Sequence, residues 1–224
     1  MHRFLSSILT LLVLISASGQ RALLSDYKVI IAKDGREWLD RNLGAARVAV
    51  SDDDSFSFGG LYQWNRANDG HQLRTSLTSG DGPVSNPGVA GSYFYTTQIF
   101  FYSWTFPLIF NPVGRDTTAW SEEQNPCPEG FRVPTAAEWQ ILVDAECIRD
   151  AASAFASTLQ LPAAGFRDSN NGNFFNVGKA GSYWSGSLEG ALRNYYFNFS
   201  PYGANILDHN KCSGFSVRCI KEIE

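Results

Sequence analysis

Apolar residues recur every three or four positions in the segment that follows residue 135. At this spacing they form one face of a helix: Trp139, Leu142 and Val143. Thr135 stands just before the pattern and Glu138 follows three residues later, which is the sequence signature of a capping box. The pattern predicts a helix that begins after Thr135 and packs its apolar face on the protein. The segment 147–160 is expected to continue as helix.

Short runs of β-branched and aromatic residues predict strands elsewhere. Near the start of the chain, 27–32 and 36–39 flank the turn signal Asp34-Gly35, which predicts an antiparallel hairpin. The last quarter contains a ladder of similar runs separated by Gly and Asn: 173–178, 181–187, 194–200, 203–207 and 214–222. This ladder predicts an antiparallel sheet.

The segment between these regions has a weaker pattern. Residues 61–70 are expected to form a short helix with Leu61 and Trp64 on its inner face. From 71 to 112 the chain is rich in Gly, Ser, Pro and Asn, and its aromatic cluster at 93–110 predicts a buried edge strand, with an exposed binding patch as the alternative. Because no Pro/Ser-rich linker divides the chain, we expect one α+β domain.

The first residues have the pattern of an export signal. Arg3 precedes the apolar run 4–15, and small residues follow at 16–19. The apolar run is shorter than a membrane-spanning helix requires. We therefore expect a signal peptide at residues 1–19 and a single domain at residues 20–224 that does not span a membrane. This domain would be exported to the periplasm, the cell surface or the extracellular space.

Composition narrows the class of partner. The chain has a formal net charge of −4, with charged residues at 18%, aromatic residues at 14% and 20 glycines. Such a composition favours a compact, loop-rich fold over a helical bundle or a disordered chain. An acidic surface without a stripe of Lys and Arg disfavours nucleic acid as a partner.

Four cysteines lie in the second half of the chain: Cys127, Cys147, Cys212 and Cys219. An exported protein occupies a compartment where disulfides persist, so structural bridges are expected. Three connectivities are possible, and the spacing does not select one of them. No C-x-x-C pair is present, which disfavours a thioredoxin-like redox site and a zinc knuckle.

The sequence contains no clear catalytic or metal-binding constellation. His71 is expected in a polar loop, and His209 has only Asp208 beside it, so neither histidine has an evident nucleophile to activate. The acidic run in 51–60 suggests calcium, but a Ca²⁺ site needs ligands from several positions, so a solvated loop is the better interpretation. We therefore expect a protein that is not an enzyme and that requires no cofactor.

Six motifs occur in an order, and at separations, that resemble a known family. They are GREWLDRNLG, GGLYQWNRANDG, CPEGFRVPTAAEWQIL, LPAAGFRD, GSYWSGS and GFSVRCIK. The chain resembles the Fibrobacter succinogenes major paralogous domain, a family of exported bacterial proteins of largely unassigned function. The resemblance covers nearly all of the expected mature chain.

This family is similar to the C-type-lectin-like group, which includes formylglycine-generating enzymes and the variable receptor-binding proteins of diversity-generating retroelements. The resemblance implies a small, twisted, mostly antiparallel sheet with two or three helices and long irregular loops. It also implies a disulfide between Cys127 and Cys219, which would leave Cys147 and Cys212 as a second pair. Two arginines of the shared motifs are expected to donate to backbone carbonyls or a carboxylate inside the fold: Arg132 and Arg218.

In the lectin-like group the final third of the chain carries the recognition surface, so the resemblance points to residues 188–211. Alternation along 194–200 places Phe197 and Phe199 on the buried side of a strand. The exposed candidates for ligand binding are then Arg193, Tyr196, Tyr202, Asp208, His209 and Lys211. Their aromatic and hydrogen-bonding side chains suit a surface glycan or a protein ligand.

The favoured hypothesis is an exported, non-catalytic binding module. Any glycan binding is expected to be independent of metal or to use another geometry, because the Glu-Pro-Asn and Gln-Pro-Asp tripeptides of calcium-dependent lectins do not occur. The alternative is a structural or assembly domain of the bacterial cell surface that contacts a protein partner through a sheet edge or the aromatic segment 94–110. An enzyme of the formylglycine-generating type is disfavoured, because that chemistry needs two reactive cysteines close together.

Overall fold

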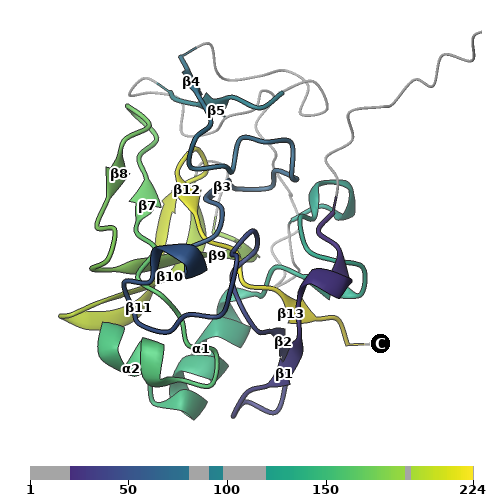
Figure 1. The fold of residues 1–224 in the computed structure, drawn as a ribbon, viewed down its shortest axis with the longest axis vertical. Helices are drawn as coiled ribbons and strands as arrows, with labels where there is room; N and C mark the ends of the chain where they lie inside the picture. The colour runs from purple at the N-terminus through teal and green to yellow at the C-terminus, as the bar shows by residue number, and fades with distance from the viewer. Residues whose placement is uncertain (1–20, 81–90, 98–119, 190–192, 224) are drawn as a thin grey trace, which may run out of the picture.

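The computed structural model describes residues 21–80, 91–97, 120–189 and 193–223 (Figure 1). The expected signal peptide at 1–19 lies outside the described residues, as does most of the aromatic segment 93–110. The described start of that segment contains β5 (Phe94–Tyr95), which pairs in parallel with β4 (Thr78–Ser79), and Phe94 is fully buried. The expected strand is therefore present at the start of the segment.

One four-stranded antiparallel sheet joins the two ends of the described chain. Its strand order is β1 (Val29–Ile31), β2 (Glu37–Leu39), β13 (Ile220–Lys221) and β6 (Phe131–Arg132). The hairpin predicted around Asp34-Gly35 is confirmed, because Ile31 pairs with Glu37. In Figure 1 the C-terminus accordingly lies beside β13 and β2.

Two further antiparallel sheets contain most of the last quarter of the chain. The first is three-stranded, in the order β11 (Gly203–Asn210), β10 (Arg193–Ser200), β9 (Gly181–Leu188). The second is four-stranded, in the order β3 (Tyr62–Gln63), β12 (Gly214–Phe215), β7 (Phe166–Arg167), β8 (Phe174–Phe175). The predicted ladder of antiparallel strands is confirmed, and the architecture is α+β.

The helix predicted after Thr135 is also confirmed. Helix α1 (Ala136–Glu146) begins with a complete capping box, in which Thr135 Oγ1 accepts from the Glu138 N–H and the Glu138 carboxylate accepts from the Thr135 N–H. The predicted apolar face is buried: Trp139, Leu142 and Val143. The helix does not continue through 147–160, because Cys147 has φ of 58° and ends it. Asp150 then caps a separate short helix, α2 (Ala151–Ala156).

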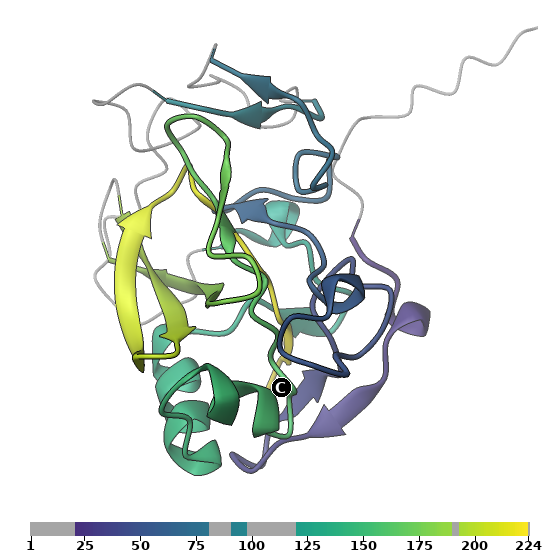
Figure 2. The same cartoon turned by 60° about the vertical axis from the view of Figure 1, so that its left-hand side comes forward.

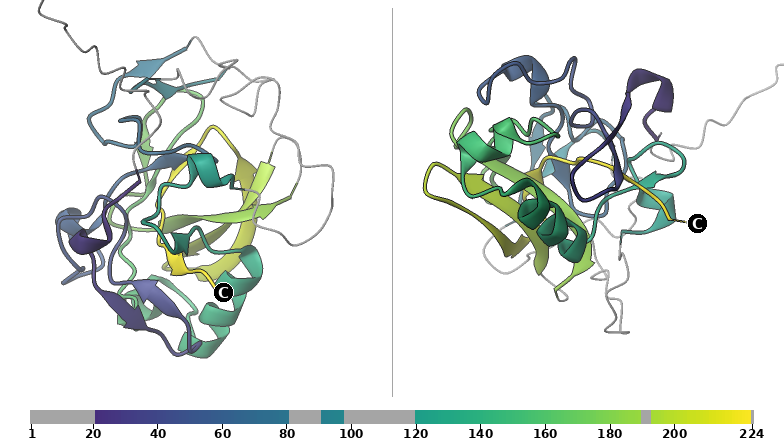
Figure 3. Two further views of the ribbon diagram at one scale, coloured as in Figure 1. Left: turned by 90° about the vertical axis from the view of Figure 1, so that its right-hand side faces the viewer. Right: turned by 90° about the horizontal axis from the view of Figure 1, so that it is seen from below.

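The sheet β9–β10–β11 separates two hydrophobic cores. On one side Phe197 and Phe199 pack against Trp139 and the rest of α1 and α2, which cover this face of the sheet (Figure 3, right). On the other side Trp184 and Tyr196 pack against the β12 segment. Within the described ranges, one-turn 3-10 helices lie in the connections outside these cores, at Leu24–Asp26, Ser55–Ser57 and Glu122–Gln124.

The helix expected at 61–70 is wrong. Residues Tyr62 and Gln63 form strand β3, and Asn65 has φ of 55°, which a right-handed helix does not allow. The Gln63 side chain donates to the carbonyl oxygens of Tyr95 and Cys212, so partners distant in the sequence fix this segment in an extended form. Leu61 and Trp64 are buried, as expected.

The disulfide implied by the family resemblance is present. Cys127 and Cys219 are bonded, which ties the segment before α1 to the segment before β13 across a sequence separation of 92 residues. The second expected pair is wrong, because Cys147 and Cys212 are free thiols. Cys147 is exposed at the end of α1, whereas Cys212 is buried beside Tyr95, so they occupy different environments.

The two arginines of the shared motifs have the structural roles predicted for them. Arg132 makes a two-pronged ion pair with Glu138, with both N–O distances at 2.8 Å. Arg218 is buried and donates to the side-chain oxygen of Asn42 and to the backbone carbonyls of Leu39 and Leu159. Arg218 thus connects β2, the following turn and the segment after α2.

Removing the disulfide is expected to lower stability. A Cys127→Ala/Cys219→Ala variant should lose about 2–5 kcal/mol of unfolding free energy, because the bridge closes a long loop and restricts the unfolded chain. Urea unfolding followed by tryptophan fluorescence measures this loss. Cys147→Ser is the control and should leave the urea midpoint unchanged, because this thiol is exposed. Equal midpoints for the double variant and the wild type would contradict the role of the bridge.

Candidate functional site

The structure divides the six predicted ligand-binding residues among three places: the two ends of the β10–β11 hairpin and the second core with its border. Arg193 and Asp208 lie together near one end of the β10–β11 hairpin, where they form an exposed ion pair. Tyr202 is 98% exposed in the turn at the opposite end of the hairpin. These ends are about 25 Å apart at the usual rise of a strand. The six residues therefore do not form one site within a single chain.

Two of the six residues are buried, so their predicted exposure is wrong. Tyr196 packs on Phe215 with ring centroids 4.6 Å apart, and burial raises the pKa of its hydroxyl. The Lys211 ammonium lies 4.6 Å from the centroid of the Trp64 ring, and burial lowers the pKa of Lys211 to about 8. Both errors involve the second core: Tyr196 lies on the face of β10 that packs on it, and Lys211, which follows β11, packs on Trp64 of that core.

His209 lies at the border between this core and the surface. Its ring is half-buried and contacts the rings of Tyr196, Phe215 and Phe166, at centroid distances of 5.9, 5.3 and 6.3 Å. Burial lowers the pKa of His209, and the positive charge of the Arg193 guanidinium lowers it further. The ring is therefore neutral at pH 7. A neutral imidazole can pack on apolar groups and still offer one hydrogen bond to a ligand.

His209 belongs to a strip of aromatic and apolar side chains that continues onto β7 and β8. Phe166 stacks on Phe175 at 5.7 Å, and Phe175 is 44% exposed. On the other side of His209, Leu207 is also 44% exposed and pairs across the sheet with Tyr196. We call this set of five side chains the aromatic strip: Phe166, Phe175, Tyr196, Leu207 and His209.

Sequence reasoning found two members of the aromatic strip and missed three. Phe175 lies in a run that we interpreted only as a strand, and Leu207 ended another such run. Phe166 lies in the LPAAGFRD motif, for which no strand was predicted. The hydrophobic pattern predicted β8 and β11 but not β7. It did not show that β7 and β8 lie beside β11, because that proximity results from pairing between distant segments.

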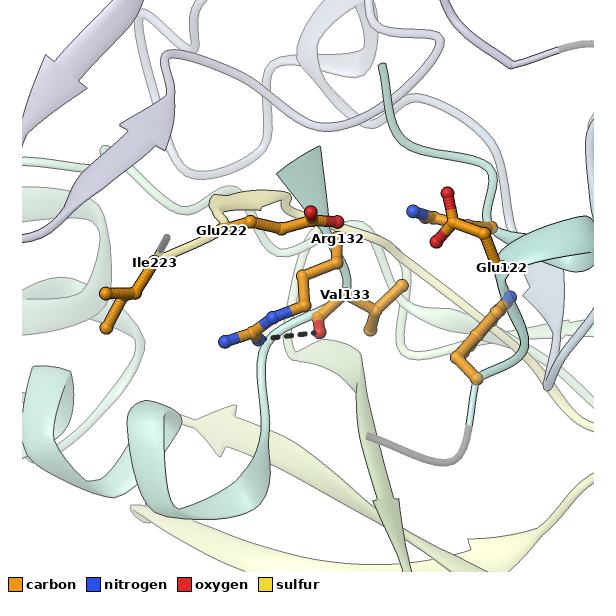
Figure 4. Close-up of a pocket in the computed structure, with 7 residues that line it drawn as sticks. Glu122, Arg132, Val133, Glu222 and Ile223 are labelled. Atoms are coloured by element: carbon orange, nitrogen blue, oxygen red, sulfur yellow. Dashed lines mark hydrogen bonds between the residues drawn. The ribbon is translucent and has the colours of Figure 1, made fainter. Parts of the chain in front are cut away.

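Two surface hollows lie elsewhere, on either side of the C-terminal strand. One, of about 300 Å³, is lined by Trp120, Glu122, Asn125, Arg132, Val133, Glu222 and Ile223 (Figure 4). Figure 4 shows Arg132 hydrogen-bonded to the Val133 carbonyl, and the same guanidinium pairs with Glu138, so Nη1 and Nη2 both have partners inside the fold. The second hollow, of about 720 Å³, borders Ile31 and Lys221.

The buried histidine His71 is a structural residue. It was expected in a polar loop, but it is fully buried. Its Nε2 atom accepts from the Gln63 N–H at 3.0 Å, so Nδ1 carries the proton and donates to Asp69 at 2.6 Å. Both ring nitrogens are therefore used. Burial lowers the pKa of His71 to about 4, which keeps the ring neutral.

Other candidates for chemistry also have structural partners. Ser213 Oγ lies 2.9 Å from His209 Nδ1, but Ser213 is fully buried and cannot meet a substrate. In the loop 51–60, the Asp54 carboxylate pairs with Arg47 and accepts from the Phe56 N–H. Within the described ranges, no three His, Cys, Asp or Glu side chains gather as they would around a metal ion.

Comparison with known proteins identifies no relative: no family model, curated protein or solved structure matches the chain. Among the helices of the described ranges, none combines the length and apolar character needed to cross a bilayer.

Acid is expected to destabilise the fold through His71. Because its folded pKa lies below the ordinary value of 6.5, the unfolded state binds more protons as the pH falls from about 6.5 to about 4. Stability should therefore fall across this window, by about 2 kcal/mol between pH 7 and pH 5. Urea unfolding at both pH values measures the loss, and His71→Gln should reduce it. An unchanged loss in this variant would contradict the assignment.

Proposed function

We propose that this protein is an exported, non-catalytic binding module with a C-type-lectin-like fold, of the Fibrobacter major paralogous type. The six ordered sequence motifs support the family. The mostly antiparallel sheets and the two short helices of the described ranges agree with such a fold. The distribution of thiols supports a non-catalytic protein, because one free cysteine is exposed at the end of α1 and the other is buried beside Tyr95.

The observation that carries the proposal is the aromatic strip. Its two ends, Phe175 and Leu207, are each 44% exposed, and the half-buried His209 and Phe166 join them on one face of the molecule. Contiguous apolar side chains at the surface mark interaction sites more often than single ones do. Two sheets support the strip, so its geometry is set before a ligand binds.

The chemistry of the strip suits a glycan. Flat aromatic faces pack against the apolar face of a sugar ring, while neighbouring polar groups bond its hydroxyls. Asn205 is exposed on the same strand face as Leu207 and His209, and it supplies both a donor and an acceptor. Binding through these groups uses no metal ion. It therefore differs from recognition by calcium-dependent lectins.

A second candidate function, assembly with a protein partner, is supported by a different surface. Val29 and Ile31 on strand β1 are exposed, as is Ile223 after β13. Ile31 and Ile223 border the larger of the two hollows, together with the charged residues Glu37 and Lys221. Apolar side chains with a charged rim are typical of protein contacts.

The aromatic strip is tested by binding of the purified protein to an array of bacterial and host surface glycans, with and without a chelator. We expect binding that the chelator does not affect and that falls by about tenfold in Phe175→Ala and in His209→Ala, since each removes a contact worth one or two kcal/mol. Phe56→Ala is the matched control, because Phe56 is 62% exposed on a different loop.

Equal loss in the control and strip variants would contradict a role for the strip. Glycan binding by none of the proteins, with all of them folded by circular dichroism, would exclude the glycan proposal. An Ile31→Lys variant that loses a protein partner would instead support assembly through the β1 surface.

A further inference from the structure

Strand β11 forms an open edge of its sheet. It has eight residues, and each pairs with a residue of β10 in an unbroken antiparallel register from Gly203 to Asn210. The opposite edge of the sheet, β9, is connected to the β12 segment through bonds between Ser216 and residues Ser182 and Trp184. No described strand pairs with the outer side of β11. In Figure 2 the yellow arrow of β11 lies on the outer side of its sheet.

The backbone groups on this outer side can be assigned from the hairpin. Ser200 and Gly203 pair across a two-residue turn, so they exchange backbone hydrogen bonds. Bonded and non-bonded pairs alternate along an antiparallel ladder, so the backbones of Asn205, Leu207 and His209 face β10. The N–H and C=O groups of Ala204, Ile206 and Asp208 therefore point outward.

Few of these outward groups have partners within the described ranges. The Asp208 carbonyl accepts from the Arg193 guanidinium at 2.8 Å. The N–H and C=O groups of Ala204 and Ile206 make no hydrogen bond to a described residue. Four backbone groups in the middle of the strand thus remain able to pair with another strand.

Nothing in the sequence of β11 blocks such pairing. Soluble proteins protect long edge strands with lysine, proline or a bulge. Strand β11 contains none of these: its sequence is GANILDHN, its register with β10 is continuous, and its one formal charge, Asp208, is already paired with Arg193. The register irregularity of this sheet lies between β9 and β10, away from the open edge.

We propose that the open edge binds the same edge of a second copy of this chain, so that two β11 strands pair antiparallel about a two-fold axis at Ile206. This register uses all three outward residues, since Ile206 pairs with its own copy and Ala204 pairs with Asp208, whose carbonyl uses its second lone pair to accept from Ala204 beside the Arg193 guanidinium. It places no two like charges opposite each other. If the two-fold axis lay at Asp208 instead, the two Asp208 carboxylates would face each other and fewer residues of the two strands would be paired.

The sequence of β11 favours a second copy over an unrelated peptide. In the proposed register, the small residue Ala204 faces the larger Asp208 on one sheet face, while Asn205 faces Leu207 on the other. Tyr202, which is 98% exposed, would lie beside Asn210 of the second copy and thus near the Arg193–Asp208 pair. The pairing uses backbone groups, so it does not depend on ligand binding by the aromatic strip.

Sedimentation equilibrium over about a hundredfold range of protein concentration tests the pairing. The weight-average mass should rise from that of a monomer towards twice that value. Ala204→Pro removes an outward N–H that makes no bond to β10, and Leu207→Lys places a charge beside the edge. Each should weaken the dimer by about tenfold or more. Val50→Lys, an equal change at a 69% exposed apolar residue outside both proposed surfaces, is the control and should dimerise as the wild type does.

A disulfide test fixes the register and does not depend on those variants. In a Cys147→Ser background, Asn205→Cys and Leu207→Cys proteins are mixed under mild oxidation. Opposed residues of a non-bonded antiparallel pair have Cα atoms about 4.5 Å apart, which suits a disulfide. The mixture should give a covalent dimer in higher yield than either protein alone. A monomer at every concentration, a dimer unaffected by Ala204→Pro, or no excess of the mixed disulfide would overturn the proposal.

Discussion

The hydrogen bonds of the buried Arg218 guanidinium are the interactions on which most of the fold depends. Its bonds join the end of β2, the Asn42 turn and the segment after α2, and the next residue, Cys219, is bonded to Cys127. Burial lowers the pKa of Arg218 to about 10, so it stays charged at neutral pH. Its hydrogen bonds to Asn42, Leu39 and Leu159 go to neutral oxygen acceptors, and loss of any of them would leave a buried charge less well satisfied. The three segments are therefore held in one arrangement.

Local signals were sufficient for the elements that depend on neighbouring residues. The capping box at Thr135 and Glu138 fixed the start of α1, and the turn at Asp34-Gly35 fixed the register of the β1–β2 hairpin. The alternation that buried Phe197 and Phe199 was also correct. The Cys127–Cys219 bridge came from the family resemblance, since spacing alone left three connectivities open.

The elements that were predicted wrongly are those whose conformation or burial depends on contacts with segments distant in the sequence. Alternation predicts one buried face for a strand, but β10 has cores on both faces, so Tyr196 is buried as well. The extended form of 62–63 depends on carbonyl oxygens at Tyr95 and Cys212, which no local pattern contains. The same limit applies to the aromatic strip, because its members come from two sheets and meet only after both have formed.

The position of β13 between β2 and β6 sets the order in which the molecule can be completed. Synthesis produces the β1–β2 hairpin and β6 before β13, so β2 and β6 have no strand between them until β13 has been made. Arg218 and Cys219 arrive at the same moment as β13. The first sheet, the disulfide and the buried arginine can therefore be completed only once residues 218–221 have been made, so this segment joins parts of the fold that were synthesised earlier.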